Sequence, residues 1–149
     1  MIHRLTLCVT TLCMAGLCMA GATSPALAAS TSWTITMTGN AEIPGPGNKD
    51  GAGTAIVSVD DTSDTICYSM SVVRIGAATA AHVHSGPAGI AGPHVAILAT
   101  PGADGISSGC VPVSHDLATA ILSDPSAYYV NVHTADFPKG ALRGQLPAG

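Results

Sequence analysis

The sequence predicts an all-β domain, an antiparallel β-sandwich or barrel of seven or eight short strands. Short runs of alternating apolar and polar residues recur along the chain, and turns rich in glycine and proline separate them at near-regular spacing. Only residues 116–122 have a helical pattern, and they are long enough for about two turns at most. No internal repeat competes with this interpretation.

The N-terminal segment differs from the rest of the chain and predicts a signal peptide. A basic start (MIHR) is followed by an apolar run over residues 5–22 and by Ala26-Leu27-Ala28, a pattern that signal peptidase cleaves. We expect removal of residues 1–28, a linker at 29–32, a β domain at 33–149, and a secreted or periplasmic location. A retained membrane anchor is the alternative, because the apolar run approaches spanning length; Pro25 and the Ala-x-Ala-like end argue against it.

The first three predicted strands follow directly. Residues 32–38 alternate apolar side chains with threonine, which indicates a strand with one buried face. The turn-rich segment 39–51 separates it from a second strand at 53–59. A turn of Asp, Thr and Ser at 60–64 then leads to a third strand at 65–73, because these side chains hydrogen-bond their own backbone in turns.

The second half of the chain is predicted from weaker patterns. Short strands at 80–84 and 94–98 flank the Gly/Pro-rich segment 85–93, and residues 110–113 are predicted as an edge strand. The helical segment follows at 116–122. The last two predicted strands are 128–134 and 140–146.

Charge and composition exclude some partners. Without residues 1–28 the chain has 121 residues, four basic and nine acidic, and a net charge of −5. This balance argues against nucleic acid and anionic membrane surfaces as partners. Aromatic residues make up 3% of the full chain, so the core must consist mainly of Val, Ile, Leu and Ala.

The cysteines predict one disulfide bond. Three of the five cysteines lie in the predicted signal peptide, which leaves Cys67 and Cys110. Two cysteines in an exported domain most simply pair with each other. Their spacing does not fit a CxxC redox pair or a thiolate metal site.

Histidines form the candidate metal site. His82 and His84 are two residues apart on a predicted strand, so both rings point to one face, with Cβ atoms roughly 6.5–7 Å apart. His133 lies on a later strand, where it shares a face with Asn131, and His94 follows a Gly-Pro turn. Imidazole ligands without thiolates suit copper or zinc. Asn131 is interpreted either as a hydrogen-bond partner that fixes a histidine ring or as an exposed strand residue. The alternatives to a metal site are a chance pair on a surface strand and a capping role for His94.

No other catalytic pattern is present. Ser114, His115 and Asp116 look like a triad, but adjacent side chains point apart and cannot form its hydrogen-bonded chain. We expect His115 to be a solvated loop residue.

Several ordered motifs resemble the CHRD domain, the module named from chordin. They are GNAEIP at 39–44, AHVHSGPAG at 81–89, YVNVHT at 129–134 and PKGALRGQL at 138–146, so the resemblance covers almost the whole predicted domain. The family occurs in secreted and cell-surface proteins. The resemblance therefore implies export and a β-sandwich more than any activity.

The order of the histidines also resembles that of copper/zinc superoxide dismutases, which are Greek-key sandwiches related in shape to immunoglobulin-like folds. They carry an H-V-H pair, a third histidine after the next loop, a fourth late in the chain, and a C-terminal arginine that guides the anion. This resemblance implies His82, His84, His94 and His133 as copper ligands and Arg143 as that arginine, with Lys139 adding positive charge. A structural role for Arg143 on loop carbonyls or Asp136 is the alternative.

The departures from the dismutases limit what the resemblance implies. The segment between His84 and His94 is too short for a zinc site, and the Cys67–Cys110 pair does not correspond to the dismutase disulfide. The sequence thus favours a copper-only, superoxide-dismutating enzyme whose substrate is a small anion. The alternatives are a copper carrier of the cell envelope and an extracellular interaction module without metal. The oligomeric state is not predicted.

Overall fold

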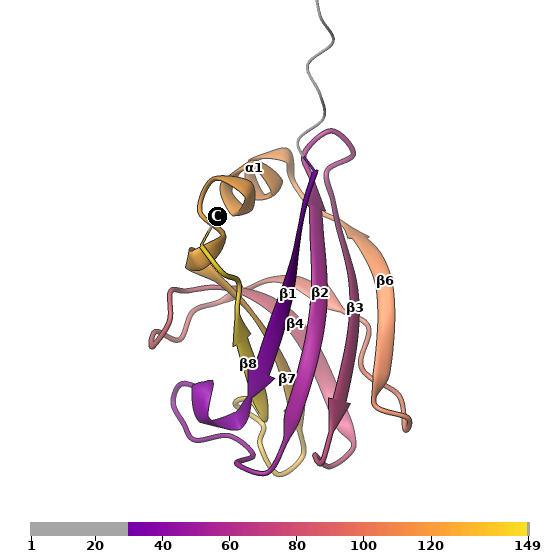
Figure 1. Ribbon diagram of the computed structural model, residues 1–149, viewed down its shortest axis with the longest axis vertical. Coiled ribbons are helices and arrows are strands. Elements are labelled where there is room, and N and C mark those ends of the chain that lie inside the picture. Colours follow the sequence, from indigo (N-terminus) through magenta and orange to yellow (C-terminus); the bar gives the residue numbers. More distant parts are fainter. Residues whose placement is uncertain (1–29, 149) are drawn as a thin grey trace, which may run out of the picture.

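The computed structural model describes residues 30–148, and the predicted signal peptide lies outside them. The elements in chain order are β1 (Ser30–Thr38), η1 (Gly39–Ala41), β2 (Ala52–Asp60), β3 (Thr65–Val73), β4 (Ala78–Ser85), β5 (His94–Leu98), β6 (Ile106–Pro112), α1 (His115–Ser123), η2 (Pro125–Ala127), β7 (Tyr128–Thr134) and β8 (Leu142–Gln145). Figure 1 shows the long strands wrapped into a barrel with α1 at one end. The all-β fold class predicted from the sequence is confirmed.

All strand pairs are antiparallel, in the order β5-β4-β7-β8-β1-β2-β3-β6. The chain leaves β3 for the far side of the barrel, and β6 returns to pair with β3, which is a crossing connection of the Greek-key type. The edge strands β5 and β6 face each other and leave the barrel nearly closed. A hydrogen bond from the Ala99 amide to the Tyr68 hydroxyl, 2.6 Å long, bridges this side.

The interior follows the alternation of the sequence. Every second residue is buried from Trp33 onward in β1, from Ala55 onward in β2 and from Ile66 onward in β3, because neighbouring side chains on a strand point to opposite faces. Aliphatic residues dominate this core, as the composition requires, and Val83, Val130 and Val132 contribute to it from β4 and β7. The opposite face of β4 and β7 carries the histidines.

The helix covers one end of the barrel. The hydroxyl of Ser114 accepts a hydrogen bond from the Leu117 amide, which caps the first turn. Ala118 and Ile121 are buried and join the core. Among the described residues, no helix has the length and apolarity to cross a membrane.

β6 is longer than the predicted segment 110–113. Ser107, Ser108 and Gly109 have weak strand propensity, but pairing with β3 makes them part of the strand. The same register opposes Cys67 and Cys110, whose Cα atoms are 4.0 Å apart, and the two form the predicted disulfide bond. The bond thus ties an edge strand to the rest of the sheet.

Candidate metal centre

Three histidine side chains meet on the outward face of the β4–β7 pair. His82 and His84 come from β4, and His133 comes from the neighbouring strand β7, where Asn131 is the cross-strand partner of His82. One ring nitrogen from each of the three histidines lies within 4.8 Å of the other two. The spacing on β4 and the register of β7 together produce this convergence.

Backbone carbonyl groups set the tautomers of two of these rings. Nδ1 of His84 lies 2.8 Å from the Gly92 oxygen, and Nδ1 of His133 lies 3.1 Å from the Pro138 oxygen. Since a carbonyl oxygen only accepts, both Nδ1 atoms must carry the proton. The lone pair of each neutral ring is therefore on Nε2. Nε2 of His84 is buried and has no hydrogen-bond partner.

The third ring completes a donor set for a metal. Nδ1 of His82 lies 3.1 Å from Nε2 of His133, and because the His133 nitrogen accepts, His82 must donate. Ligand nitrogens at a copper or zinc ion are about 3 Å apart, so small rotations would bring all three onto one ion. A bound ion would take the place of the proton that His82 Nδ1 donates to His133 Nε2. The three imidazoles therefore fit a metal ion.

The electrostatics keep these imidazoles neutral, as metal ligands must be. Burial, followed by the neighbouring His133, His84 and His94, lowers the pKa of His82 to about 4. Burial is also the main cause that lowers the pKa of His84 and of His133. Protons therefore do not compete with a metal at neutral pH.

His94 lies beside the three close histidines without being one of them. It is exposed at the start of β5, and its ring stacks on that of His82 with centroids 5.2 Å apart. Its own centroid is 6.2 Å from that of His84. The structure thus brings three of the four predicted ligands together and leaves the fourth next to them on the solvent side.

Arg143 has a structural environment. It is 1% exposed, and its guanidinium group donates to the carbonyl oxygens of Pro87 and Ile90 and to the side chain of Gln145. It also lies over the ring of Tyr129, with Cζ 3.5 Å from the centroid. These contacts match the structural alternative for Arg143, on carbonyls of the β4–β5 loop. A buried guanidinium group is poorly placed to attract an anion from solvent. Lys139 is exposed.

Tyr129 connects Arg143 to the histidines. Its ring stacks on that of His84, with centroids 4.8 Å apart and planes at 14°. Because β7 lies between β4 and β8, His84 and Arg143 contact Tyr129 from opposite neighbouring strands. No local sequence pattern predicts this role of Tyr129, since the role depends on the strand order.

Asn131 and Glu42 are buried next to the site. Asn131 is 1% exposed, which excludes the alternative of an exposed strand residue, and Glu42 is 2% exposed. Burial raises the pKa of Glu42 to about 7, and the positive charge of Arg143 offsets only part of this increase. Sequence reasoning missed Glu42 as a site residue; the GNAEIP motif that contains it was the available signal.

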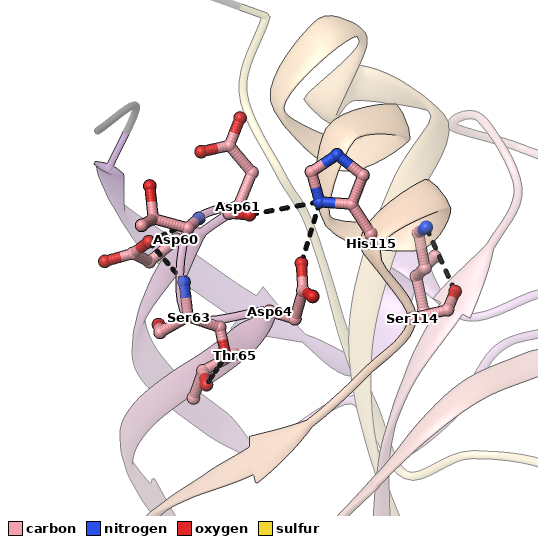
Figure 2. A network of polar contacts seen from close by, with 9 residues as sticks. Asp60, Asp61, Ser63, Asp64, Thr65, Ser114 and His115 are labelled. Atoms are coloured by element: carbon pink, nitrogen blue, oxygen red, sulfur yellow. Dashed lines mark hydrogen bonds and ion pairs between the residues drawn. The ribbon is translucent and has the colours of Figure 1, made fainter. Parts of the chain in front are cut away.

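His115 lies in a separate polar network at the start of α1 (Figure 2). Nδ1 of His115 is 2.9 Å from Oδ1 of Asp64 and 3.1 Å from the carbonyl oxygen of Asp61, in the β2–β3 turn. The Asp64 hydrogen bond raises the pKa of His115, whose side chain is 65% exposed. His115 is therefore helical, in contrast to the predicted loop position, but it is solvated as expected, and Ser114 caps the helix instead of forming a triad.

Comparison with known proteins identifies the domain. The sequence model of the CHRD domain matches residues 33–146. Neither the curated proteins nor the solved structures include a significant match to the chain. The match covers nearly all of the described barrel, including the three close histidines, Asn131 and Glu42, so the chain belongs to the CHRD domain family.

Proposed function

We propose that this CHRD domain protein binds one copper ion at His82, His84 and His133, with His94 as a fourth ligand, and uses it to convert superoxide into dioxygen and hydrogen peroxide. Copper, when bound, supplies the one-electron chemistry that this reaction requires. The protein's own residues hold the ion, keep the imidazoles neutral and leave one side of the site towards solvent.

One observation carries the metal proposal. The Nδ1 protons of His84 and His133 are donated to backbone carbonyl groups, which leaves the Nε2 lone pair of each ring free. One nitrogen from each of the three rings lies within 4.8 Å of the other two. A hydrogen bond at the second ring nitrogen is the usual support for a metal-bound histidine. The buried Nε2 of His84 lacks any partner, which is costly in a domain without a ligand there.

The donor set favours copper over zinc. The three close ligands are all imidazoles, and no carboxylate or thiolate belongs to the cluster among residues 30–148. Nitrogen sites generally bind Cu²⁺ more tightly than Zn²⁺. The stacking of His94 on His82 offers a fourth nitrogen after a side-chain rotation. The disulfide bond supports the proposed secreted or periplasmic location, because such bonds persist in oxidising compartments.

A copper carrier without catalysis is the second candidate. The position of His94 allows either candidate. Four imidazoles in one plane leave an axial position of copper open, whereas four imidazoles that enclose the ion exclude superoxide. An enzyme needs an open position at the ion. The two candidates therefore differ in whether bound copper reacts.

Copper loading followed by a superoxide assay tests the proposal. The wild-type protein and a His82→Ala/His84→Ala variant are titrated with Cu²⁺, their electron paramagnetic resonance spectra recorded, and the rate of superoxide loss compared with that of free copper. His115→Ala is the matched control, because it removes a histidine outside the cluster. We expect one copper per wild-type chain with nitrogen hyperfine structure, and activity that the double variant lacks and the control keeps.

Other outcomes separate the alternatives. Bound copper without activity above free copper would leave only the carrier. A folded wild-type protein that stays metal-free in micromolar copper would exclude both metal functions and favour an extracellular interaction module.

A further inference from the structure

A buried carboxyl group lies behind the histidine cluster, and the proposed function does not use it. Glu42 follows η1 and is 2% exposed, and its Oε1 atom is buried without a hydrogen-bond partner. Carboxyl groups are rarely buried to this extent, because transfer from water is unfavourable unless the group is well paired. The burial of Glu42 therefore indicates a structural or functional role for its carboxyl group.

The backbone around Glu42 is shaped to admit this carboxyl group. Gly140 has φ 139°, and a Cβ atom there would lie 2.3–2.4 Å from the carboxyl carbon and oxygens of Glu42. Any other residue at 140 would occupy the same space. Gly140 belongs to the β7–β8 connection, which also contains Pro138, the acceptor for His133. One short connection thus accommodates the carboxyl group and orients a ring of the cluster.

Asn131 connects Glu42 to the histidines. It lies on β7, opposite His82 on β4 and opposite Arg143 on β8, and it is 1% exposed. Side chains directly opposite each other on neighbouring strands have Cβ atoms about 5 Å apart. The Oδ1 atom of Asn131 is buried and has no partner. An acceptor on the face of His82 therefore lacks a donor.

The effects on the neighbouring groups indicate how the amide is oriented. Asn131 is near enough to Glu42 to lower the pKa of its carboxyl group, as a nearby donor, the amide nitrogen, does. The amide oxygen, which has no partner, is then left for the side of His82, the residue opposite Asn131 on β4. The nitrogen thus faces Glu42 and the oxygen faces the rings.

Of the three rings, only His82 has no backbone carbonyl group as a hydrogen-bond acceptor for its remaining N–H in the metal-loaded protein. His84 and His133 donate Nδ1–H to the carbonyl groups of Gly92 and Pro138. If a metal occupies Nδ1 of His82, the remaining ring proton must be on Nε2, and it needs an acceptor. The unpartnered Oδ1 of Asn131 is the acceptor that the structure offers.

We propose that Glu42 and Asn131 are positioning residues for the histidine site: Glu42 holds the amide of Asn131, and the amide oxygen accepts the Nε2–H of His82 in the metal-loaded protein. This inference rests on the proposed function in taking His82 as a ligand. It holds for copper or zinc and does not depend on superoxide chemistry.

The test compares variants that keep or remove the hydrogen bonds. Glu42→Gln keeps an acceptor for the Asn131 amide, and Glu42→Leu removes that acceptor. Asn131→Leu removes the amide itself. We expect Cu²⁺ affinity within about threefold of wild type for Glu42→Gln, and about 10–100-fold weaker for both leucine variants, the range typical of lost partners of metal-bound histidines. Ser107→Ala is the control, because it removes another buried, unpartnered polar group, on β6.

A second readout separates positioning from loss of fold. In zinc-loaded protein, nuclear magnetic resonance should show a His82 Nε2–H that exchanges slowly with solvent in wild type and Glu42→Gln, and rapidly in Asn131→Leu. Circular dichroism and thermal melting check that each variant is folded. Glu42→Leu should remain folded above neutral pH, because burial disfavours the charged form of Glu42 more than Arg143 favours it.

The outcomes are distinct. Wild-type affinity and unchanged His82 exchange in both leucine variants would overturn the positioning proposal and leave the proposed function intact. A wild-type protein that binds neither Cu²⁺ nor Zn²⁺ would overturn both. Equal weakening in Glu42→Gln and Glu42→Leu would overturn the hydrogen-bond role assigned to Glu42.

Discussion

Individual hydrogen bonds decide the chemistry of the histidine cluster. The spacing of His82 and His84 predicts that both rings share a face, but not which nitrogen of each ring is free. The carbonyl groups of Gly92 and Pro138 make that choice for His84 and His133. Neither carbonyl can be identified from a motif, because every residue has one and only the folded loops bring these two to the rings.

The four predicted ligands should not contribute equally to metal binding. His133→Ala removes one of the three converging rings, and we expect it to weaken Cu²⁺ binding by more than the roughly 10–100-fold typical of a lost hydrogen-bonded partner. His94→Ala should weaken it by less than about tenfold, because His94 lies outside the close group. Competition titration with a copper chelator measures both. Equal losses of Cu²⁺ affinity in the two variants would show that all four histidines contribute equally to binding.

The β4–β5 loop, residues 86–93, is the element that connects the core to the site. Arg143 and Gln145 on β8 donate to the carbonyl groups of Gly86, Pro87 and Ile90, and the loop in turn supplies the Gly92 oxygen to His84. The loop is therefore held at its base by one strand and orients a ring on another.

Arg143→Leu should release this loop. The substitution removes the hydrogen bonds that Arg143 donates to the Pro87 and Ile90 oxygens. We expect a loss of at least about 3 kcal/mol in the free energy of unfolding, since each hydrogen bond to a charged group contributes about 1.5–3 kcal/mol. Urea unfolding measures the loss. Copper affinity should also fall because Gly92 is displaced. Arg74→Leu is the control, with one hydrogen bond to an exposed turn. Unchanged stability with lost superoxide activity would instead restore the anion-guiding role.

The disulfide bond should stabilise the edge strand β6. The cysteines are 43 residues apart, so a Cys67→Ala/Cys110→Ala variant is expected to lose about 3–5 kcal/mol on the chain-entropy account. The loss should appear as a lower urea midpoint, with faster amide hydrogen exchange in β6 than in β7. A variant whose exchange rates rise equally throughout the barrel would contradict the assignment of the effect to β6.

At the scale of the whole molecule, the shifted pKa values of His82 and Glu42 make the stability of the metal-free protein depend on pH in opposite directions. The folded-state pKa of His82 is about 4, below the usual 6.5, so the unfolded chain binds more protons in this window and stability rises with pH. The folded-state pKa of Glu42 is about 7, above the usual 4.5, so the folded chain binds more protons between these values and stability falls as pH rises. The two effects partly cancel.

Glu42→Gln removes one of the two effects. The variant should match wild type near about pH 5 and exceed it by up to about 3 kcal/mol near pH 8, which is the free-energy equivalent of the Glu42 shift. Its stability should therefore rise more steeply with pH than that of wild type. Denaturant unfolding of metal-free protein at both pH values measures the difference. A gain that is equal at both pH values would show that Glu42 does not titrate in this range.

The strand segments were predictable because their signal is local. Alternation in β1, β2 and β3 has the period of a strand with one buried face, and the helical pattern at 116–122 matches α1. The serine- and glycine-rich half of β6 was not predictable, since its pairing with β3 outweighs weak propensity. The disulfide followed from there being two cysteines outside the predicted signal peptide.

By itself the sequence determined the all-β class, the shared face of His82 and His84, the pairing of Cys67 with Cys110 and the resemblance to CHRD domains, because each depends on local period, counting or motif. Only the tertiary structure decided that β7 lies beside β4, which brings His133 to the pair. It also decided that Arg143 is buried and that Glu42 lies behind the rings. These outcomes depend on strand order and loop packing, in which residues far apart in the chain meet, and no local pattern encodes such meetings.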